Sequence, residues 1–556
     1  MSALPFFDCN CMIGARAQRH QRSIWQLDDY RSEFDYYDIV GAVVHHAVAA
    51  EYSPDYGNRR LLREIGDDPQ LVPQWVLLPH HAGEMPPPDE LVAEMLSLGV
   101  RTARLLPTTH RFGTAEYVIG ELLSELERHR LPLFLDLSEV AWHELVDLCQ
   151  AHPLLPVVLC GVGYGAGQQL YPSCQQCPNL YVETHRFQDH QAYQRFVAEF
   201  GENRLLFGTG LPHCSPGSPH MMTLYQDIPE SARPMIAGAN LLQLLEGVTG
   251  VSGRPLPHLR APREHPDDDP IVASVRAGRP LSDEFIIDCH GHLAHPGAMG
   301  AIGLAMPGQD ADSAIISMDR LGVDILAFSM WSGLVEGDAE ANDLALEAVA
   351  RYPDRLMAYG CYNTRYPEIY QAELERVFYT DRVIGIKPYG LYSRVRIDDP
   401  VRHASYQWAS DNHKPILGCG SFSAESQQLT PQMAMRLAER YPGAAWIISH
   451  ATSSYQMVEA VIEACSALSN IYAEVCYSSI LYAGAEMLYE SIPLEQILYG
   501  SDAMMRDPAS QLGWMCWARI PYQAKQRILG QNFADILGMA PEARTPRSTR
   551  PPATQH

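Results

Sequence analysis

The stretch Ile287-Asp288-Cys289-His290-Gly291-His292 places two histidines at the end of a short apolar run. A run of this length and composition predicts a β-strand. Because successive side chains of a strand point to opposite faces, the imidazoles of His290 and His292 share one face. Two imidazoles so placed are typical of a chelating pair for a divalent metal ion.

Seven more apolar runs follow this one, separated by longer amphipathic stretches that predict helices. The eight runs cover residues 285–289, 323–328, 356–361, 383–386, 415–417, 445–449, 471–475 and 497–499. Strands that alternate with helices indicate a parallel sheet, and eight strands are the number that closes a (β/α)8 TIM barrel. We therefore predict an α/β fold with such a barrel over residues 284–540.

The first half of the chain contains a weaker copy of the same pattern. Its apolar runs cover residues 6–9, 39–44, 71–78, 102–106, 131–135, 156–160, 180–183 and 205–207. The two halves align with an offset that drifts only from 280 residues (Asp288 against Asp8) to 292 (Asn532 against Asn240). Such slow drift predicts an internal repeat, and thus two tandem (β/α)8 barrels.

The segment 249–283 separates the two halves. It is rich in proline and contains the acidic run Asp267-Asp268-Asp269, which predicts an extended linker. The resulting domains are a first barrel over 1–248 and a second over 284–540. The tail 541–556, rich in Pro, Thr and Arg, is predicted to be disordered.

The composition narrows the range of partners. A formal net charge of -25 over 556 residues disfavours binding to nucleic acid or to an anionic membrane, so we expect a small-molecule substrate. Thirteen cysteines without a dense spacing pattern suit reduced thiols, and no signal peptide or membrane span is found, which predicts a cytoplasmic protein. The CxxC pair Cys174 and Cys177 lacks the second pair that a structural zinc site needs.

A carboxylate stands at the end of the last predicted strand of the second block, in Tyr499-Gly500-Ser501-Asp502. In a closed barrel the last strand lies beside the first, and the carboxyl ends of all strands meet at one cavity. Asp502 can therefore reach a metal ion held by His290 and His292, or accept a proton from water bound to that ion.

These motifs, together with Gly385-Ile386-Lys387-Pro388 and Ile448-Ser449-His450, resemble those of the amidohydrolase superfamily. More narrowly they resemble its amidohydrolase-related branch of metal-dependent hydrolases and decarboxylases. The resemblance implies that His290 and His292 bind a divalent metal, usually zinc. It also implies that Asp502 is a ligand or base and His450 a ligand or catalytic group. Lys387 matches a position that is a carbamylated lysine in some relatives, but an unmodified lysine that neutralises a carboxylate or binds an acidic substrate group is the favoured interpretation.

The sequence departs from the family pattern at the fifth strand of the second block. Relatives carry a ligand histidine there, whereas this chain reads Pro415-Ile416-Leu417-Gly418-Cys419. Cys419 is either a thiolate ligand or a small buried filler, since a free cysteine suits both roles. We therefore expect one metal ion rather than two.

The first block has lost every matched ligand position. Asn10 and Met12 stand against His290 and His292, Arg104 against Lys387, and Gly210 against Asp502. The same comparison sets Asp136 against Cys419 and Cys160 against His450. We expect a non-catalytic barrel that packs against the second, covers its pocket or forms a homo-oligomer contact.

The leading functional hypothesis is a metal-dependent hydrolase that acts on an amide, lactone or related acyl compound through a metal-activated water. His450 and Lys387 would then stabilise the developing oxyanion or grip a substrate carboxylate. The alternatives are a nonoxidative decarboxylase or hydratase, which the same branch contains, and a non-catalytic scaffold.

Overall fold

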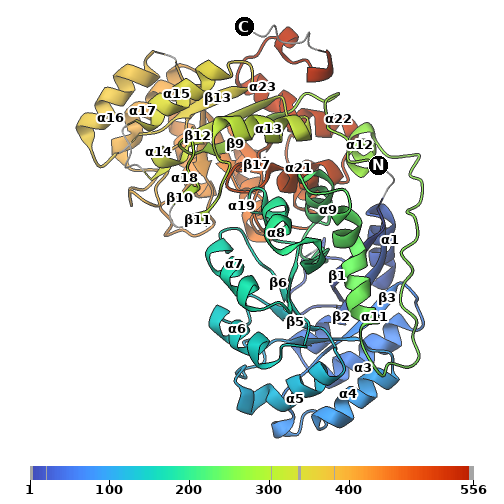
Figure 1. The fold of residues 1–556 in the computed structure, drawn as a ribbon. Coiled ribbons are helices and arrows are strands. Elements are labelled where there is room, and N and C mark those ends of the chain that lie inside the picture. The colour runs from blue at the N-terminus through green and yellow to red at the C-terminus, as the bar shows by residue number, and fades with distance from the viewer. Residues whose placement is uncertain are drawn as a thin grey trace. The chain divides into compact units, whose positions relative to one another are not determined.

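The computed structural model describes residues 4–20, 22–301, 304–335, 340–362, 364–380 and 382–549. The chain divides into two compact units, residues 1–266 and 267–556. In each unit strands and helices alternate along the chain (Figure 1).

The first unit is built around an eight-stranded parallel sheet in the order β1 to β8. Its strands are β1 (Phe6–Ile13), β2 (Ile39–His46), β3 (Leu71–Val76), β4 (Thr102–Leu105), β5 (Leu133–Asp136), β6 (Val157–Cys160), β7 (Leu180–Glu183) and β8 (Leu205–Leu206). Backbone hydrogen bonds from Cys9 N to Phe207 O (2.9 Å) and from Met12 N to Leu211 O (2.9 Å) join the two ends of the sheet. The sheet is therefore closed into a barrel.

Helices connect these strands. They are α1 (Leu27–Tyr36), α2 (Ala47–Glu51), α3 (Pro54–Ile65), η1 (His80–Ala82), α4 (Pro88–Ser97), α5 (Glu116–Arg128), α6 (Trp142–Ala151), α7 (Gly167–Gln176), α8 (Ala192–Phe200), η2 (Glu202–Arg204), α9 (Gly217–Tyr225), α10 (Ala232–Pro234), η3 (Met235–Ala239) and α11 (Asn240–Glu246).

The second unit repeats the plan. Its parallel strands are β9 (Ile287–Leu293), β12 (Ile325–Met330), β13 (Leu356–Gly360), β14 (Gly385–Ile386), β15 (Pro415–Cys419), β16 (Ala445–Ser449), β17 (Ile471–Val475) and β18 (Ile497–Tyr499). A small antiparallel hairpin, β10 (Gly300–Ala301) with β11 (Leu304–Ala305), follows the first strand and was not predicted. The prediction of two tandem (β/α)8 barrels is confirmed.

The helices of the second unit are α12 (Pro270–Arg276), α13 (Ala311–Leu321), α14 (Trp331–Leu334), α15 (Ala341–Arg351), α16 (Pro367–Glu373), η4 (Leu374–Phe378), η5 (Pro400–Arg402), α17 (His403–Asp411), α18 (Pro431–Arg440), α19 (Tyr455–Ala467), α20 (Gly484–Ser491), η6 (Leu494–Gln496), α21 (Pro508–Trp517), α22 (Tyr522–Gln526), η7 (Arg527–Gln531), α23 (Asn532–Ile536), η8 (Pro541–Ala543) and η9 (Arg547–Thr549). None of the helices among the described residues is long and apolar enough to cross a membrane.

Each barrel has its own apolar core. In the first, Phe7, Val43 and Phe134 pack with Leu241 of α11. In the second, Ile287, Ile325 and Leu417 pack with Phe533 of α23, among others. In both units a helix near the end of the barrel, α11 or α23, thus contributes to the core.

The segment predicted as an extended linker contains helix α12. Pro270 is the first residue of this helix, a position where proline is tolerated. The Asp269 side chain accepts hydrogen bonds from the backbone N–H groups of Ile271 and Val272 and so caps the helix. These two features explain why a helix begins at Pro270. Of the tail predicted as disordered, residues 541–549 include η8 and η9, and residues 550–556 lie outside the described residues.

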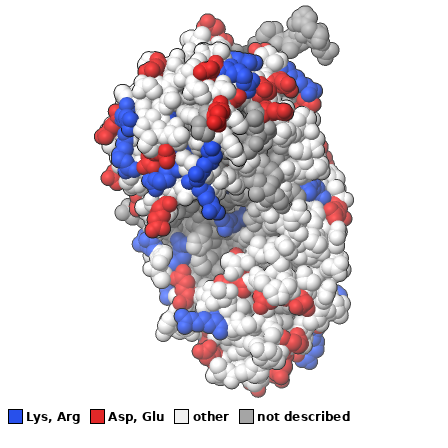
Figure 2. Space-filling view, turned by 90° about the vertical axis from the view of Figure 1, so that its left-hand side faces the viewer, with Lys and Arg blue, Asp and Glu red and all other residues white. Residues whose placement is uncertain are grey.

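Figure 2 shows acidic and basic side chains interspersed on one face of the molecule.

Candidate metal centre

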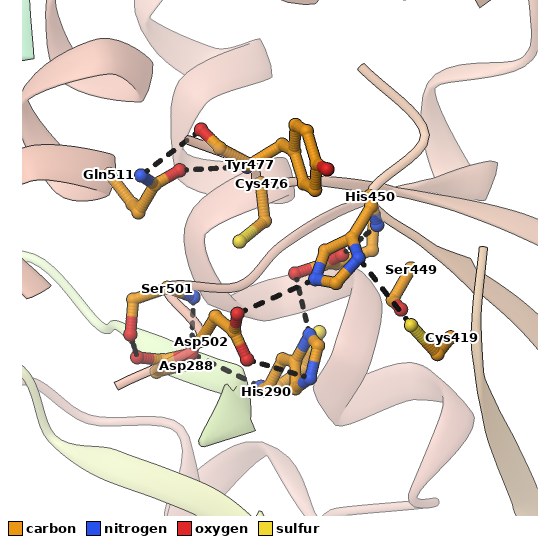
Figure 3. Close-up of polar contacts among 12 residues, drawn as sticks. Asp288, His290, Cys419, Ser449, His450, Cys476, Tyr477, Ser501, Asp502 and Gln511 are labelled. Atoms are coloured by element: carbon orange, nitrogen blue, oxygen red, sulfur yellow. Dashed lines mark hydrogen bonds and ion pairs between the residues drawn. The ribbon is translucent and has the colours of Figure 1, made fainter. Parts of the chain in front are cut away.

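The two histidines of β9 converge on Asp502, which follows β18. Their Nε2 atoms lie 3.2 Å apart. Oδ1 of Asp502 lies 3.3 Å from Nε2 of His290 and 2.9 Å from Nε2 of His292. All three side chains are buried, and Figure 3 shows the contact between His290 and Asp502. Three potential metal donors therefore face one point.

The backbone that closes the barrel sets the direction of this carboxylate. Asp502 N donates to His290 O at 2.8 Å, and Met504 N donates to His292 O at 3.0 Å. Asp502 itself has a φ of 58°, in the left-handed region that few residues other than glycine and asparagine or aspartate adopt. Backbone strain of this kind is often held at functional sites.

The other ring nitrogen of each histidine has its own partner. Nδ1 of His290 lies 3.2 Å from Oε1 of Glu474, and Nδ1 of His292 lies 3.0 Å from Oγ of Ser329. Burial, together with the charge of Lys387, lowers the pKa of both imidazoles well below the usual value, so both are neutral. A neutral His290 that donates from Nδ1 presents the lone pair of Nε2 to the centre.

Glu474 fixes two histidines at once. Its Oε2 accepts a hydrogen bond from the backbone N–H of His450 at 2.7 Å, while Oε1 contacts His290. Burial alone would raise the pKa of this carboxyl, but the contacts with His290 and His450 outweigh it and lower the pKa to about 2. The carboxylate is therefore charged although it is fully buried.

Two buried cations flank the three donors. Nζ of Lys387, just after β14, lies 2.7 Å from Nε2 of His290. The guanidinium of Arg506 forms an ion pair with Oδ2 of Asp502. Each of the two cations is only 2% exposed. Burial lowers the pKa of Lys387, against the opposing influence of neighbouring thiols and Glu474.

His450 and Cys419 lie on the other side of Asp502. Sγ of Cys419 is 3.7 Å from Nδ1 of His450, and Nε2 of His450 is 3.6 Å from Oδ2 of Asp502 (Figure 3). Burial alone would raise the pKa of the Cys419 thiol, but the neighbouring His450, Lys387 and Arg506 lower it overall.

The donors fit a divalent ion. Two groups of three residues among those described bring their donor atoms within 4.8 Å of one another: His290, His292 and Asp502, and His290, His450 and Cys476. In the first group the separations of 2.9 to 3.3 Å are close to the spacing of ligands that each stand about 2.0–2.1 Å from one zinc ion. Cys419 belongs to neither of these groups.

A buried aspartate below these donors ties the first strand to the last in both barrels. Asp288 accepts hydrogen bonds from the backbone N–H of His290 (3.1 Å) and of Ser501 (2.9 Å), and from the Ser501 hydroxyl. Asp8 makes the same three contacts with Asn10 and Thr209. Burial raises the pKa of Asp288 to about 7 and that of Asp8 to about 6.

In the first barrel a guanidinium occupies the equivalent centre. Arg104 donates to Oδ1 of Asn10 at 2.7 Å and to Oε1 of Gln74 at 2.7 Å. Asn10 in turn donates to Oε2 of Glu183 at 3.2 Å. These contacts repeat those of Lys387, His290 and Glu474, but a fixed positive charge and an amide replace the metal donors.

The carboxylate position of the first barrel is also closed. A Cβ atom on Gly210 would lie 2.7 Å from Cδ2 of His185, so the imidazole fills the space that the Asp502 side chain takes in the second barrel. Gly210 has a φ of 68°, close to that of Asp502. The backbone of the turn is thus retained while its functional side chain is gone.

The register corrects one predicted correspondence. Asp136 pairs with Cys160 in the first barrel, and Cys419 pairs with Ser449 in the second. Cys160 therefore corresponds to Ser449, and the counterpart of His450 is Gly161, which shares its positive φ. The predicted runs 156–160 and 445–449 end at these two corresponding residues, Cys160 and Ser449.

The structure gathers all the predicted site residues at the carboxyl ends of the strands: His290, His292, Lys387, Cys419, His450 and Asp502. Cys419 lies beside His450 rather than with the three closest donors. Sequence reasoning gave no definite role to Glu474 and overlooked Ser329 and Cys476. The sequence did contain a signal for Glu474. The first copy has a glutamate, Glu183, at the same position of a strand that is otherwise apolar, and a glutamate repeated in this way indicates a specific role.

No curated protein matches the chain. The chain is similar to the solved structures of 2,6-dihydroxybenzoate decarboxylase from Rhizobium (14% identity, TM-score 0.39, 46% of this chain and 99% of that one) and of 5-carboxyvanillate decarboxylase from Sphingomonas paucimobilis (17%, 0.35, 46% and 99%). It is also similar to that of a dihydroxybenzoic acid decarboxylase from Polaromonas sp. JS666 with bound manganese (15%, 0.37, 47% and 99%). The amidohydrolase family model matches residues 22–245 and 287–539, most of both barrels, and the chain therefore belongs to the amidohydrolase family.

Proposed function

We propose that the second unit is a metal-dependent hydrolase. It would cleave an amide, a lactone or a related acyl bond in a small molecule that also carries a negative charge. The observation that carries this proposal is the convergence of His290, His292 and Asp502, whose donor atoms lie 2.9 to 3.3 Å apart. These three residues would hold one divalent ion, with zinc the metal that best suits two imidazoles and a carboxylate.

A bound ion of this kind supplies a Lewis acid and lowers the pKa of a water molecule into the neutral range. The chain's own contribution is to hold the donors in place beforehand. Glu474 and Ser329 fix the rings of His290 and His292 through their Nδ1 atoms. Because ligand rings held in this way lose little freedom on binding, such partners raise the affinity of a site for its metal.

Lys387 and Arg506 support an anionic substrate. Both are buried beside the donors, where the two carboxylates of Asp502 and Glu474 balance their charge. A bound divalent ion would add positive charge to the same centre. Developing negative charge on an acyl oxygen, or a carboxylate of the substrate, would be stabilised there.

His450 is better placed than Asp502 to move protons. One oxygen of Asp502 faces the two histidines, and the other is paired with Arg506, which makes that carboxylate a weak base. Nε2 of His450 is buried and has no hydrogen-bond partner among the described residues. We therefore assign the role of general acid and base to His450, in place of the Asp502 role expected from the sequence.

A second candidate is nonoxidative decarboxylation. The ion pair between Asp502 and Arg506 favours it, because a carboxylate held by a guanidinium is poorly suited to take a proton from water. Lys387 and Arg506 would then bind the carboxylate that is lost.

Isotope labelling separates the two reactions. The zinc-loaded chain is incubated in H₂¹⁸O with a panel of N-acetyl amino acids, lactones, 2,6-dihydroxybenzoate and 5-carboxyvanillate, and the products are analysed by mass spectrometry. Hydrolysis predicts one ¹⁸O atom in the new carboxylate and no release of carbon dioxide. Release of carbon dioxide without ¹⁸O in the organic product would replace the first candidate by the second. If turnover is the same in a His292→Ala variant, both metal-dependent readings are wrong.

A further inference from the structure

The imidazole of His450 lies between the thiol of Cys419 and the carboxylate of Asp502 in the second barrel (Figure 3). Sγ of Cys419 is 3.7 Å from Nδ1 of His450, and Nε2 of the same ring is 3.6 Å from Oδ2 of Asp502. The three residues come from the ends of β15, β16 and β18. A thiol beside an imidazole is the pair of nucleophile and base that activates a cysteine in acyl transfer.

The imidazole is held in the orientation that this role needs. The His450 backbone N–H donates to Glu474, and its φ of 58° turns the side chain back over the barrel mouth. Its ring stacks on His290 with centroids 5.4 Å apart and contacts Tyr477 at 5.1 Å. His450 is only 8% exposed, and its Nδ1 faces the sulfur, so this nitrogen can accept a proton that Cys419 releases.

Cys419 differs from the other thiols of its unit. It is 9% exposed, whereas Cys465 in α19 is 2% exposed, and burial raises the pKa of Cys465 to about 12. The next residue, Gly420, allows the backbone to pass so near β16 that a Cβ there would lie 2.0 Å from Ser449 O. This close approach brings the sulfur to the ring of His450.

We propose that Cys419 is a catalytic nucleophile that takes the acyl group of the substrate, with His450 as its base. The proposal rests on the proposed acyl chemistry of the same site and replaces both roles that the sequence left open for Cys419, metal ligand and buried filler. The first barrel has no equivalent dyad, since Asp136 and Gly161 occupy these two positions.

The covalent step balances without an oxidant or reductant. Sγ attacks the acyl carbon, the S–C bond forms as the bond from that carbon to the leaving group breaks, and the thiol proton passes to Nδ1 of His450 and then to the leaving group. Water then attacks the thioester and gives its proton to His450. The acid product is released as the proton returns to the Cys419 sulfur.

The reactivity of Cys419 is testable without turnover. The zinc-loaded full chain is treated with limiting iodoacetamide, and alkylation of each cysteine is followed by peptide mass spectrometry. We expect Cys419 to react at least about tenfold faster than Cys465, because it has a base in contact. A His450→Asn variant, whose side chain tolerates the positive φ, should slow Cys419 by about tenfold and leave Cys465 unchanged. Equal rates for the two cysteines in the wild-type chain would overturn the proposal, whether or not the variant folds.

A trapping experiment identifies the acyl group on the sulfur. p-Nitrophenyl acetate is added, the reaction is stopped with acid within seconds, and the Cys419 peptide is examined for an acetyl group. The adduct should form in the wild type and be absent in Cys419→Ser, which should still bind zinc. If Cys419→Ser keeps zinc and hydrolyses acyl substrates at the wild-type rate, the nucleophile is wrong while the proposed hydrolase stands. If His292→Ala, which has lost zinc, hydrolyses acyl substrates at the wild-type rate, the metal-dependent part of the proposed function is wrong instead.

Discussion

The paired aspartates Asp8 and Asp288 show how one residue can be kept by the fold while its surroundings lose their function. Each joins the first strand of its barrel to the turn after the eighth through the same three hydrogen bonds. Neither contacts the other donor atoms of its centre. Their shared position therefore reflects closure of the barrel rather than catalysis.

An Asp8→Asn variant should change how stability depends on pH. Burial raises the pKa of Asp8 from 3.8 to about 6, so the native state holds a proton that the unfolded chain has lost between these values. Its contribution to stability is full below about pH 4 and is lost as the pH rises through about 6, a change of about 2–3 kcal/mol. The amide can still accept hydrogen bonds from the backbone of Asn10 and Thr209. The variant should therefore gain stability relative to the wild type between pH 4 and 7.5, measured by urea unfolding. A difference that is constant over this range would contradict the account.

Glu474 should act on the metal through His290. Replacement by glutamine removes the charge that holds Nδ1–H, and loss of such a partner typically weakens metal binding by about 10–100-fold. Competition with a zinc chelator measures this change. Glu183→Gln in the first barrel is the matched control, and it should leave the zinc affinity unchanged. Equal effects of the two substitutions would place the metal elsewhere.

Among the elements, the last helical segment of each barrel is anchored by an asparagine. Nδ2 of Asn240 donates to Glu202 O (2.7 Å) and Leu205 O (2.9 Å), and Nδ2 of Asn532 donates to Leu494 O (2.7 Å) and Ile497 O (2.8 Å). These bonds hold the eighth strand of each barrel in place. Gly210 in the first barrel and Asp502 in the second lie in the turn that follows this strand. Each asparagine thus helps to position the turn after the eighth strand, where the barrel closes.

Substitution of either asparagine by alanine should destabilise only its own unit. Loss of two buried hydrogen bonds costs about 1–3 kcal/mol, since it leaves two carbonyl groups unsatisfied. Hydrogen exchange followed by mass spectrometry would show faster exchange in β8 for Asn240→Ala and in β18 for Asn532→Ala. Faster exchange of both strands in each variant would mean that the two units do not unfold separately.

The strands could be predicted from the sequence because alternating apolar runs record burial directly, and the structure has all sixteen runs as strands. The short hairpin β10–β11 could not, since its residues carry no turn or strand signal of the usual kind. The end of β6 at Cys160 was predicted, but Cys160 was matched with His450 rather than with Ser449, because neither residue type repeats between the two copies. The contact between Cys419 and His450 depends on the geometry of two strand ends, which no local pattern encodes.

At the scale of the whole molecule, the two units have the same barrel fold but different residues at the carboxyl ends of the strands. The second has neutral imidazoles and a carboxylate, whereas the first has Arg104, an amide and a filled turn at Gly210. Restoring the ligands by Asn10→His, Met12→His and Gly210→Asp together should therefore not create a second zinc site. His185 fills the space that the new carboxylate would need. A second bound zinc ion in this triple variant would show that the first barrel is still competent.

The metal content of the full chain tests the central claim most directly. After equilibration with zinc and removal of excess metal, inductively coupled plasma mass spectrometry should find about one zinc ion per chain, as expected for one site with two imidazoles and a carboxylate. His292→Ala should lose that ion, and Met12→Ala, its matched control in the first barrel, should keep it. Zinc that persists in His292→Ala, or disappears in Met12→Ala, would contradict a metal centre confined to the second unit.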